Sequence, residues 1–116
     1  MDVRRRPGYS RSMLSPAESA VLAGLKSDIL RRFGHRLEGF VLFGSRARSE
    51  GTESSDLDVL VLVRGVSRQE RRAIIDLSYD RELETGLVIS PFVRDPMGAP
   101  LAAGIAGEIA RDGRAL

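Results

Sequence analysis

The apolar run VLVLV, residues 59–63, restricts the fold of this chain more than any other segment. Every side chain in it is apolar, so both faces of a strand built from it must be covered. Such a strand is typical of the interior of a sheet that has helices packed against it. We therefore predict that residues 56–63 form a central strand.

Two segments carry a helical capping box, in which a serine and a glutamate three residues later satisfy each other's backbone N–H groups. Ser15 opens a helix that has Pro16 at its first position and ends at Gly34. Ser67 opens a second helix that ends at Thr85-Gly86. Apolar side chains at three- and four-residue spacing support both helices. They are Val21, Leu22, Leu25, Ile29 and Phe33 in the first and Ile74, Ile75, Leu77 and Leu83 in the second.

The remaining segments complete an alternation of helices and strands. Strands are predicted at residues 37–43 and 87–93, and Pro91 inside the latter indicates an edge position or a bulge. A helix of small residues is expected at 99–111, followed by an extended tail at 113–116. This alternation predicts the α/β (α+β) class, with a small mixed β-sheet and helices packed against it.

The length of 116 residues is that of one domain. Residues 1–14, which include Arg4 to Arg6, lack periodicity and are expected to form a mobile basic arm, so residues 15–116 form the domain. No apolar stretch approaches the roughly 18 residues of a membrane span. The basic start leads into Pro7-Gly8-Tyr9 instead of the apolar core of a signal peptide. We therefore expect a cytoplasmic protein that does not associate with a membrane.

Composition excludes several kinds of site. The chain has no cysteine, which excludes disulfides, thiol catalysis and cysteine-based zinc sites. Its single histidine, His35, leaves little for a histidine-rich metal site, so any metal must be bound by oxygen. The net charge of +2 and the aromatic content of 5% offer little for nucleic acid binding. A regulatory nucleic-acid binder that uses Arg4 to Arg6 is accordingly the weakest interpretation.

Gly44-Ser45 is expected where the 37–43 strand ends and the chain turns, exposing backbone N–H groups. Glycine lacks a Cβ and lets a phosphate approach the backbone, and the Ser45 hydroxyl adds a donor. Neither the P-loop pattern GxxxxGK[ST] nor the pattern GxGxxG occurs in the sequence. The segment therefore predicts a phosphate site of another kind.

Asp56 and Asp58 are two residues apart on the predicted central strand, so both side chains project from one face, opposite Leu57 and Val59. Two ionised carboxylates this close repel each other unless a cation lies between or beside them. Oxygen ligands without His or Cys favour Mg²⁺ or Mn²⁺. Taken alone, Asp-x-Asp would favour a plain turn that leads into a strand. Together with Gly44-Ser45, it fits phosphoryl or nucleotidyl transfer.

The combination of the two motifs is more specific than either part. Phe43-Gly44-Ser45, a gap of ten residues and Asp56-Leu57-Asp58-Val59 resemble the signature of the nucleotidyltransferase superfamily typified by DNA polymerase β. Within that superfamily, the segment "FGSRAR…SDLDVLV" is similar to the minimal nucleotidyltransferases of bacteria and archaea. The resemblance covers roughly residues 15–93 by element order.

The resemblance implies a palm-like αβ sheet and Mg²⁺-dependent transfer of a nucleoside monophosphate from an NTP, ATP by preference, with pyrophosphate as the product. It assigns catalysis and metal binding to Asp56 and Asp58, and nucleotide binding to Gly44, Ser45, Arg46 and Arg48, the two arginines by position only. Members of the minimal group are often the antitoxin half of a pair with a HEPN-domain ribonuclease, which they can adenylylate. A HEPN-domain protein is therefore an expected partner.

One position departs from the family pattern. Active members usually carry a third carboxylate on the next strand, but residues 86–93 contain no acid and Ser90 stands at the nearest equivalent place. Two functions therefore stay open. The chain is either a metal-dependent nucleotidyltransferase whose acceptor is activated by another group, or a nucleotide- and partner-binding module that neutralises a partner by occupancy. The acceptor, the choice of NTP and the oligomeric state, a homo-oligomer included, are left open too.

Overall fold

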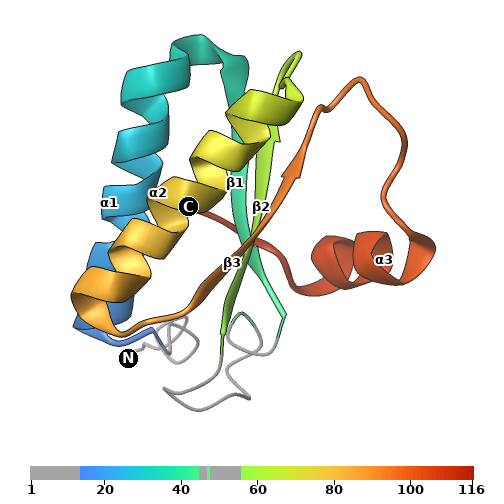
Figure 1. The fold of residues 1–116 in the computed structure, drawn as a ribbon. Coiled ribbons are helices and arrows are strands. Elements are labelled where there is room, and N and C mark those ends of the chain that lie inside the picture. Colours follow the sequence, from blue (N-terminus) through green and yellow to red (C-terminus); the bar gives the residue numbers. More distant parts are fainter. Residues whose placement is uncertain (1–13, 45–46, 48–55) are drawn as a thin grey trace.

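A computed structural model describes residues 14–44, 47 and 56–116. Its four-stranded sheet consists of β1 (Leu37–Phe43), β2 (Leu57–Val63), β3 (Ile89–Arg94) and β4 (Arg114–Ala115) in the order β3-β2-β1-β4 (Figure 1). β1 is antiparallel to β2 and to β4, whereas β2 and β3 are parallel. The sheet is therefore mixed, as predicted, and β2 is the interior strand that its apolar sequence requires.

The two capped helices form where the sequence predicts them. In α1 (Pro16–Phe33), Ser15 and Glu18 complete the capping box, and Gly34 follows the last turn. In α2 (Arg68–Thr85), Ser67 and Glu70 do the same, and Gly86 ends the helix in the left-handed conformation with φ of 77°. The reciprocal hydrogen bonds span 2.8–3.0 Å in both boxes, so these helix starts are determined locally.

The two faces of β2 meet different surroundings. On one face its side chains are at most 1% exposed and join the core formed by α1 and α2; they are Leu57, Val59, Val61 and Val63. Asp58, Leu60 and Leu62 alternate with them and point to the other face. Figure 1 shows α1 and α2 together on one side of the sheet and α3 (Ala103–Asp112) on the other. The carboxylate of Asp58 is therefore kept out of the main core.

Part of the predicted apolar face of α2 is exposed. Ile74 is fully buried, and Leu77 packs against the core. Ile75 and Leu83, which share the apolar spacing, are 41% and 68% exposed. Helical spacing identifies apolar positions, but it does not show which of them an element of the same chain will cover.

β3 and α3 both begin later than predicted. β3 starts at Ile89, and Pro91 lies on an edge strand, where its missing N–H costs no sheet hydrogen bond. α3 starts at Ala103 instead of residue 99. The preceding segment contains an Asp95 turn, in which the carboxylate accepts from the Met97 N–H at 3.0 Å, and then Pro100, which disfavours helical backbone in the residue before it.

The extended tail forms a short strand. β4 pairs with β1 through Val41 and Leu42, and the Leu116 N–H donates to the Phe40 carbonyl at 2.9 Å. Two residues are too few to show a period in the sequence, so the pairing could not be predicted. The tail matters for the site because it draws the end of α3 against β1.

Arg36 ties the loop after β2 to the start of α2. Its guanidinium donates to both carboxylate oxygens of Glu70, at 2.8 and 3.0 Å, and to the carbonyls of Arg64 and Gly65. The hydrogen bonds from Arg36 and from the Ser67 backbone lower the pKa of Glu70 to about 2. This end of the sheet is therefore held by charge and hydrogen bonds, and the opposite end carries the predicted site.

The predicted arm, residues 1–14, lies outside the described residues apart from Leu14, which packs against the core. None of the helices in the described ranges has the length and apolar character needed to cross a membrane.

Candidate nucleotide and metal site

Three strands start or stop side by side at one end of the sheet, which we also call the site edge. Because β1 and β2 are antiparallel, the end of β1 lies beside the start of β2, and Phe43 pairs with Asp58. Because β2 and β3 are parallel, the start of β3 lies there too, and Asp58 pairs with Ser90. The pairing thus gathers Gly44, Asp58 and Ser90, which come from three different segments of the chain.

Gly44 is buried in direct contact with Asp58. Its φ of 82° lies in the left-handed region, which side chains with a Cβ rarely adopt. A Cβ placed on Gly44 would collide with Oδ2 of Asp58 and come within 3.3 Å of its Cγ. The chain then turns, with the Ala47 N–H donating to the Gly44 carbonyl at 3.1 Å. Both the backbone conformation and the available space therefore require glycine at this position.

Asp56 and Asp58 both lie at this end of the sheet. The Ser90 hydroxyl donates to Oδ2 of Asp56 at 3.2 Å, which orients the exposed carboxylate beside the strand start. Asp58 is half-buried, and its pKa is raised first by burial, then by the charge of Asp56 and then by that of Glu108. An ionised Asp58 thus lies in an unfavourable environment that a cation would relieve.

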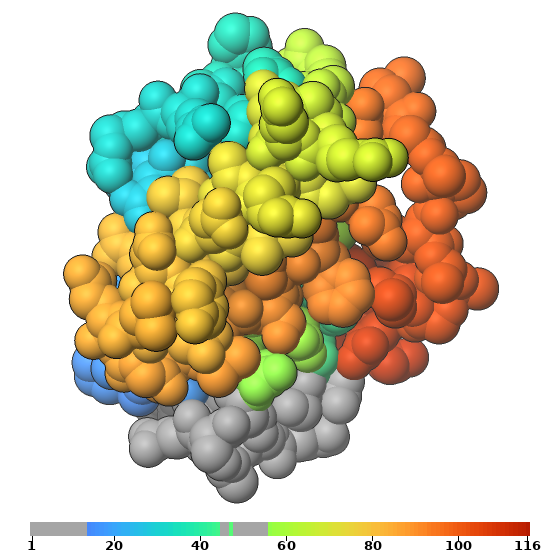
Figure 2. All heavy atoms as spheres, viewed as in Figure 1, coloured from blue at the N-terminus to red at the C-terminus, as the bar shows by residue number. Residues whose placement is uncertain are grey.

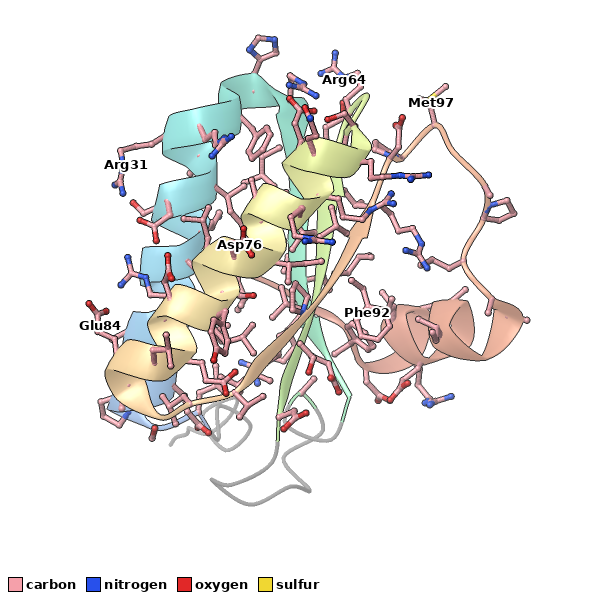
Figure 3. The ribbon with its side chains drawn as sticks, viewed as in Figure 1. Arg31, Arg64, Asp76, Glu84, Phe92 and Met97 are labelled. Atoms are coloured by element: carbon pink, nitrogen blue, oxygen red, sulfur yellow. The ribbon has the colours of Figure 1, made fainter. Side chains whose placement is uncertain are left out.

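Two aromatic side chains pack together beside Asp58. Phe43 and Phe92 make an edge-to-face contact with ring centroids 5.2 Å apart. Both come from the strand face that carries Asp58, and Figure 3 shows Phe92 between β3 and α3. This apolar contact helps to explain why burial is the main cause of the raised pKa of Asp58.

α3 adds charged groups that the sequence analysis missed. Glu108 is half-buried on α3, and its charge acts on Asp58. At the end of the helix, Arg111, Asp112 and Arg114 line a pocket of ≈ 330 Å³ together with Ala47 from the turn after Gly44. The sequence offered no signal for these residues, because their approach depends on how α3 and β4 pack against β1.

The remaining predicted site residues, Ser45, Arg46 and Arg48, lie outside the described residues. Gly44, Asp56 and Asp58 are brought together as the motif requires, whereas His35 precedes β1 and lies at the opposite end of that strand.

The donor set fits a hard divalent cation. Asp56 and Asp58 supply carboxylate oxygens, and the chain has no cysteine. Among the described residues, no group of three or more Asp, Glu, His or Cys side chains is arranged as a complete metal cage. Mg²⁺ commonly takes one or two carboxylates and completes its shell with water and substrate phosphates. The geometry therefore suits a cation that arrives with a phosphate ligand.

Comparison with known proteins agrees with this geometry. Residues 22–107 match a family model described as the nucleotidyltransferase domain. A Methanocaldococcus jannaschii protein, provisionally named a protein adenylyltransferase, is 34% identical over 74 residues, which are 63% of this chain and 75% of that protein.

Two solved structures share the fold. One is provisionally described as a minimal nucleotidyltransferase; it has a TM-score of 0.57 and 26% identity, and the match covers 84% of this chain and 91% of that one. The other is a toxin–antitoxin structure with AMP-PNP, with a TM-score of 0.55, 18% identity and coverage of 79% and 69% respectively. These likenesses confirm the predicted fold.

Gly44→Ala should destabilise the protein more than Gly86→Ala. Both glycines have positive φ, which costs an alanine about 1–2 kcal/mol, but nothing lies within 4 Å of a Cβ at Gly86. The contact with Asp58 should add about 1–3 kcal/mol at Gly44. Urea unfolding of the two variants measures the difference. Equal losses would show that Asp58 does not restrict the space at Gly44.

Asp58→Asn should stabilise the ligand-free protein at pH 7. Because the folded state raises the pKa of Asp58, it binds more protons than the unfolded state between the two pKa values, so stability falls as pH rises through that window. Asparagine does not ionise, so the variant does not lose this stability as the pH rises. Its advantage should vanish below the ordinary aspartate pKa of 3.8. Chemical unfolding across pH tests this, with the exposed Asp76→Asn as control. A variant less stable than wild type at pH 7 would contradict the prediction.

Proposed function

The chain belongs to the nucleotidyltransferase domain family, as the sequence motif predicted, and on that premise we propose that it transfers a nucleoside monophosphate from ATP to a hydroxyl of a partner protein. The observation that carries the proposal is the contact of Gly44 with Asp58 at the sheet edge that also holds Asp56. The turn at which we propose that a phosphate binds thus adjoins two carboxylates that favour a cation.

The reaction is a displacement at phosphorus. The acceptor hydroxyl oxygen forms a bond to the α-phosphorus, the bond from that phosphorus to the bridging oxygen of the β-phosphate breaks, and pyrophosphate leaves. The hydroxyl proton passes to a base. Bound Mg²⁺ would neutralise charge on the phosphate oxygens while this happens.

The described residues divide this work between them. Gly44 supplies the positive φ of the turn and leaves room for the Asp58 carboxylate beside the proposed phosphate position. Asp56 and Asp58 would hold the cation, and the Ser90 hydroxyl keeps Asp56 oriented by its hydrogen bond. Ser45, Arg46 and Arg48 are proposed to contact the triphosphate, as the motif suggests.

Glu108 is the proposed source of the third acidic group. β3 has Ser90 where the family pattern has a carboxylate, but Glu108 approaches from α3, on the same side of the sheet as Asp58. A half-buried carboxylate near the reacting centre can accept the proton of an acceptor hydroxyl. In this proposal the base has moved from the neighbouring strand to the C-terminal helix.

The choice of ATP and of a protein acceptor rests on the comparisons. The relative from M. jannaschii is provisionally named a protein adenylyltransferase, and a structure of the same fold was solved as a toxin–antitoxin with AMP-PNP. We therefore propose a toxin-type partner, with a HEPN-domain protein as the first candidate. Ser90 in place of an acid favours the alternative, a module that binds nucleotide and neutralises the partner by occupancy.

Incubation with ATP labelled at the α-phosphate, Mg²⁺ and a HEPN-domain protein from the same genome tests the proposal. The wild type should label the acceptor and release pyrophosphate, and Asp56→Asn/Asp58→Asn should lose both activities. Glu108→Gln should slow transfer by about 10²-fold or more, because a general base typically contributes 10²–10⁴-fold. Glu84→Gln, a 72% exposed glutamate on α2, should match the wild type.

Two results would contradict the proposal in different ways. If wild type and double variant are equally silent but bind the nucleotide and neutralise the partner, the occupancy module is correct. If transfer proceeds unchanged in Glu108→Gln, the enzyme stands but its base is another group.

A further inference from the structure

A row of large apolar side chains runs along the outer side of α2. Ile75, Tyr79 and Leu83 follow each other at four-residue spacing, so they lie on one side of the helix. They are 41%, 55% and 68% exposed. In Figure 2, α2 lies across the face turned to the viewer, and no other described element covers it. We call this exposed side of α2, with the charged residues that flank the row, the α2 face.

Charge is divided between the two halves of the α2 face. Arg68, Arg71 and Arg72 stand in the first half of the helix. Asp76, labelled in Figure 3, then Asp80 and Glu82 stand in the second half. Within the described part of the chain, no ion pair or side-chain hydrogen bond joins any of these six to another residue. The helix thus presents a basic half and an acidic half that are free to meet other charges.

The shape of the α2 face also differs between its two halves. A hollow of ≈ 420 Å³ lies in the first half, among the side chains Arg68, Gln69, Arg71, Arg72 and Ile75. The second half carries the projecting side chains Tyr79 and Leu83. A surface with a hollow at one end and projections at the other can fit a copy of itself that runs in the opposite direction.

We propose that the α2 face binds a second copy of this chain, with the two α2 helices antiparallel across a two-fold axis. The axis passes near the middle of the helix, so Ile75 of each copy meets Tyr79 of the other. Arg71 and Arg72 of one copy then face Asp80 and Glu82 of the other. A parallel arrangement would instead set like charges against each other. Self-complementary contacts of this kind are what a two-fold dimer requires.

The dimer leaves the candidate site of each copy accessible. α2 covers the side of the sheet opposite α3, whereas Asp58 points toward the α3 side. Association through α2 therefore neither buries Asp58 nor requires α3 to move. Each copy would keep a site open to its own nucleotide and acceptor.

Reciprocal charge reversal tests the dimer. Arg71→Glu/Arg72→Glu leaves Arg68 as the only basic side chain among these six, and Asp80→Arg/Glu82→Arg leaves Asp76 as the only acidic one. Wild type should be dimeric in sedimentation equilibrium, each variant alone should be monomeric because its own charges repel, and an equimolar mixture should recover the dimer mass. Arg31→Glu/Arg32→Glu on α1, a reversal of equal size, should stay dimeric. Circular dichroism melting checks that every variant is folded.

Each alternative outcome overturns the proposal. A monomeric wild type at all accessible concentrations would show that the α2 face does not join two copies. Folded variants that dimerise alone would place the interface elsewhere. A mixture that stays monomeric would show that these charges do not meet across a two-fold axis, and the face would then belong to a different partner.

Discussion

The register between β1 and β2 is the constraint on which the rest of the structure depends. It sets Phe43 beside Asp58 and alternates the carboxylate with side chains that are fully buried under α1 and α2. A shift of one residue would turn Asp58 into that core, because successive strand residues face opposite ways. An unpaired buried charge costs several kcal/mol, so the apolar side chains and the carboxylate favour the same register.

That register also explains why the site lowers the stability of the ligand-free protein and why a ligand could restore it. Asp58 is half-buried, faces the charges of Asp56 and Glu108, and touches a glycine that cannot be replaced without a clash. Groups with perturbed pKa values gather at functional sites because binding relieves what folding alone leaves unfavourable. A cation bound beside Asp58 would relieve this unfavourable charge.

Much of the fold could be predicted because its signals are local. The Ser15 and Ser67 capping boxes, Gly86 and the doubly apolar β2 each act over a few residues, and the structure has them as predicted. The motif predicted that Gly44 and the two aspartates belong to one site, whereas the contact of Gly44 with Asp58 follows from the pairing of β1 with β2. What could not be predicted depends on tertiary packing. The two residues of β4 show no period. The charge of Glu108 acts on Asp58 only because α3 packs on β1, and the exposure of Leu83 depends on what covers α2.

Titration with Mn²⁺ and ATP, followed by the broadening of backbone amide signals in NMR, tests the central claim most directly. The amides of Gly44, Leu57 and Ser90 should broaden first, because they surround the two carboxylates, and Asp56→Asn/Asp58→Asn should abolish the effect. Broadening that begins at the acidic half of α2, or that persists unchanged in the double variant, would contradict the account.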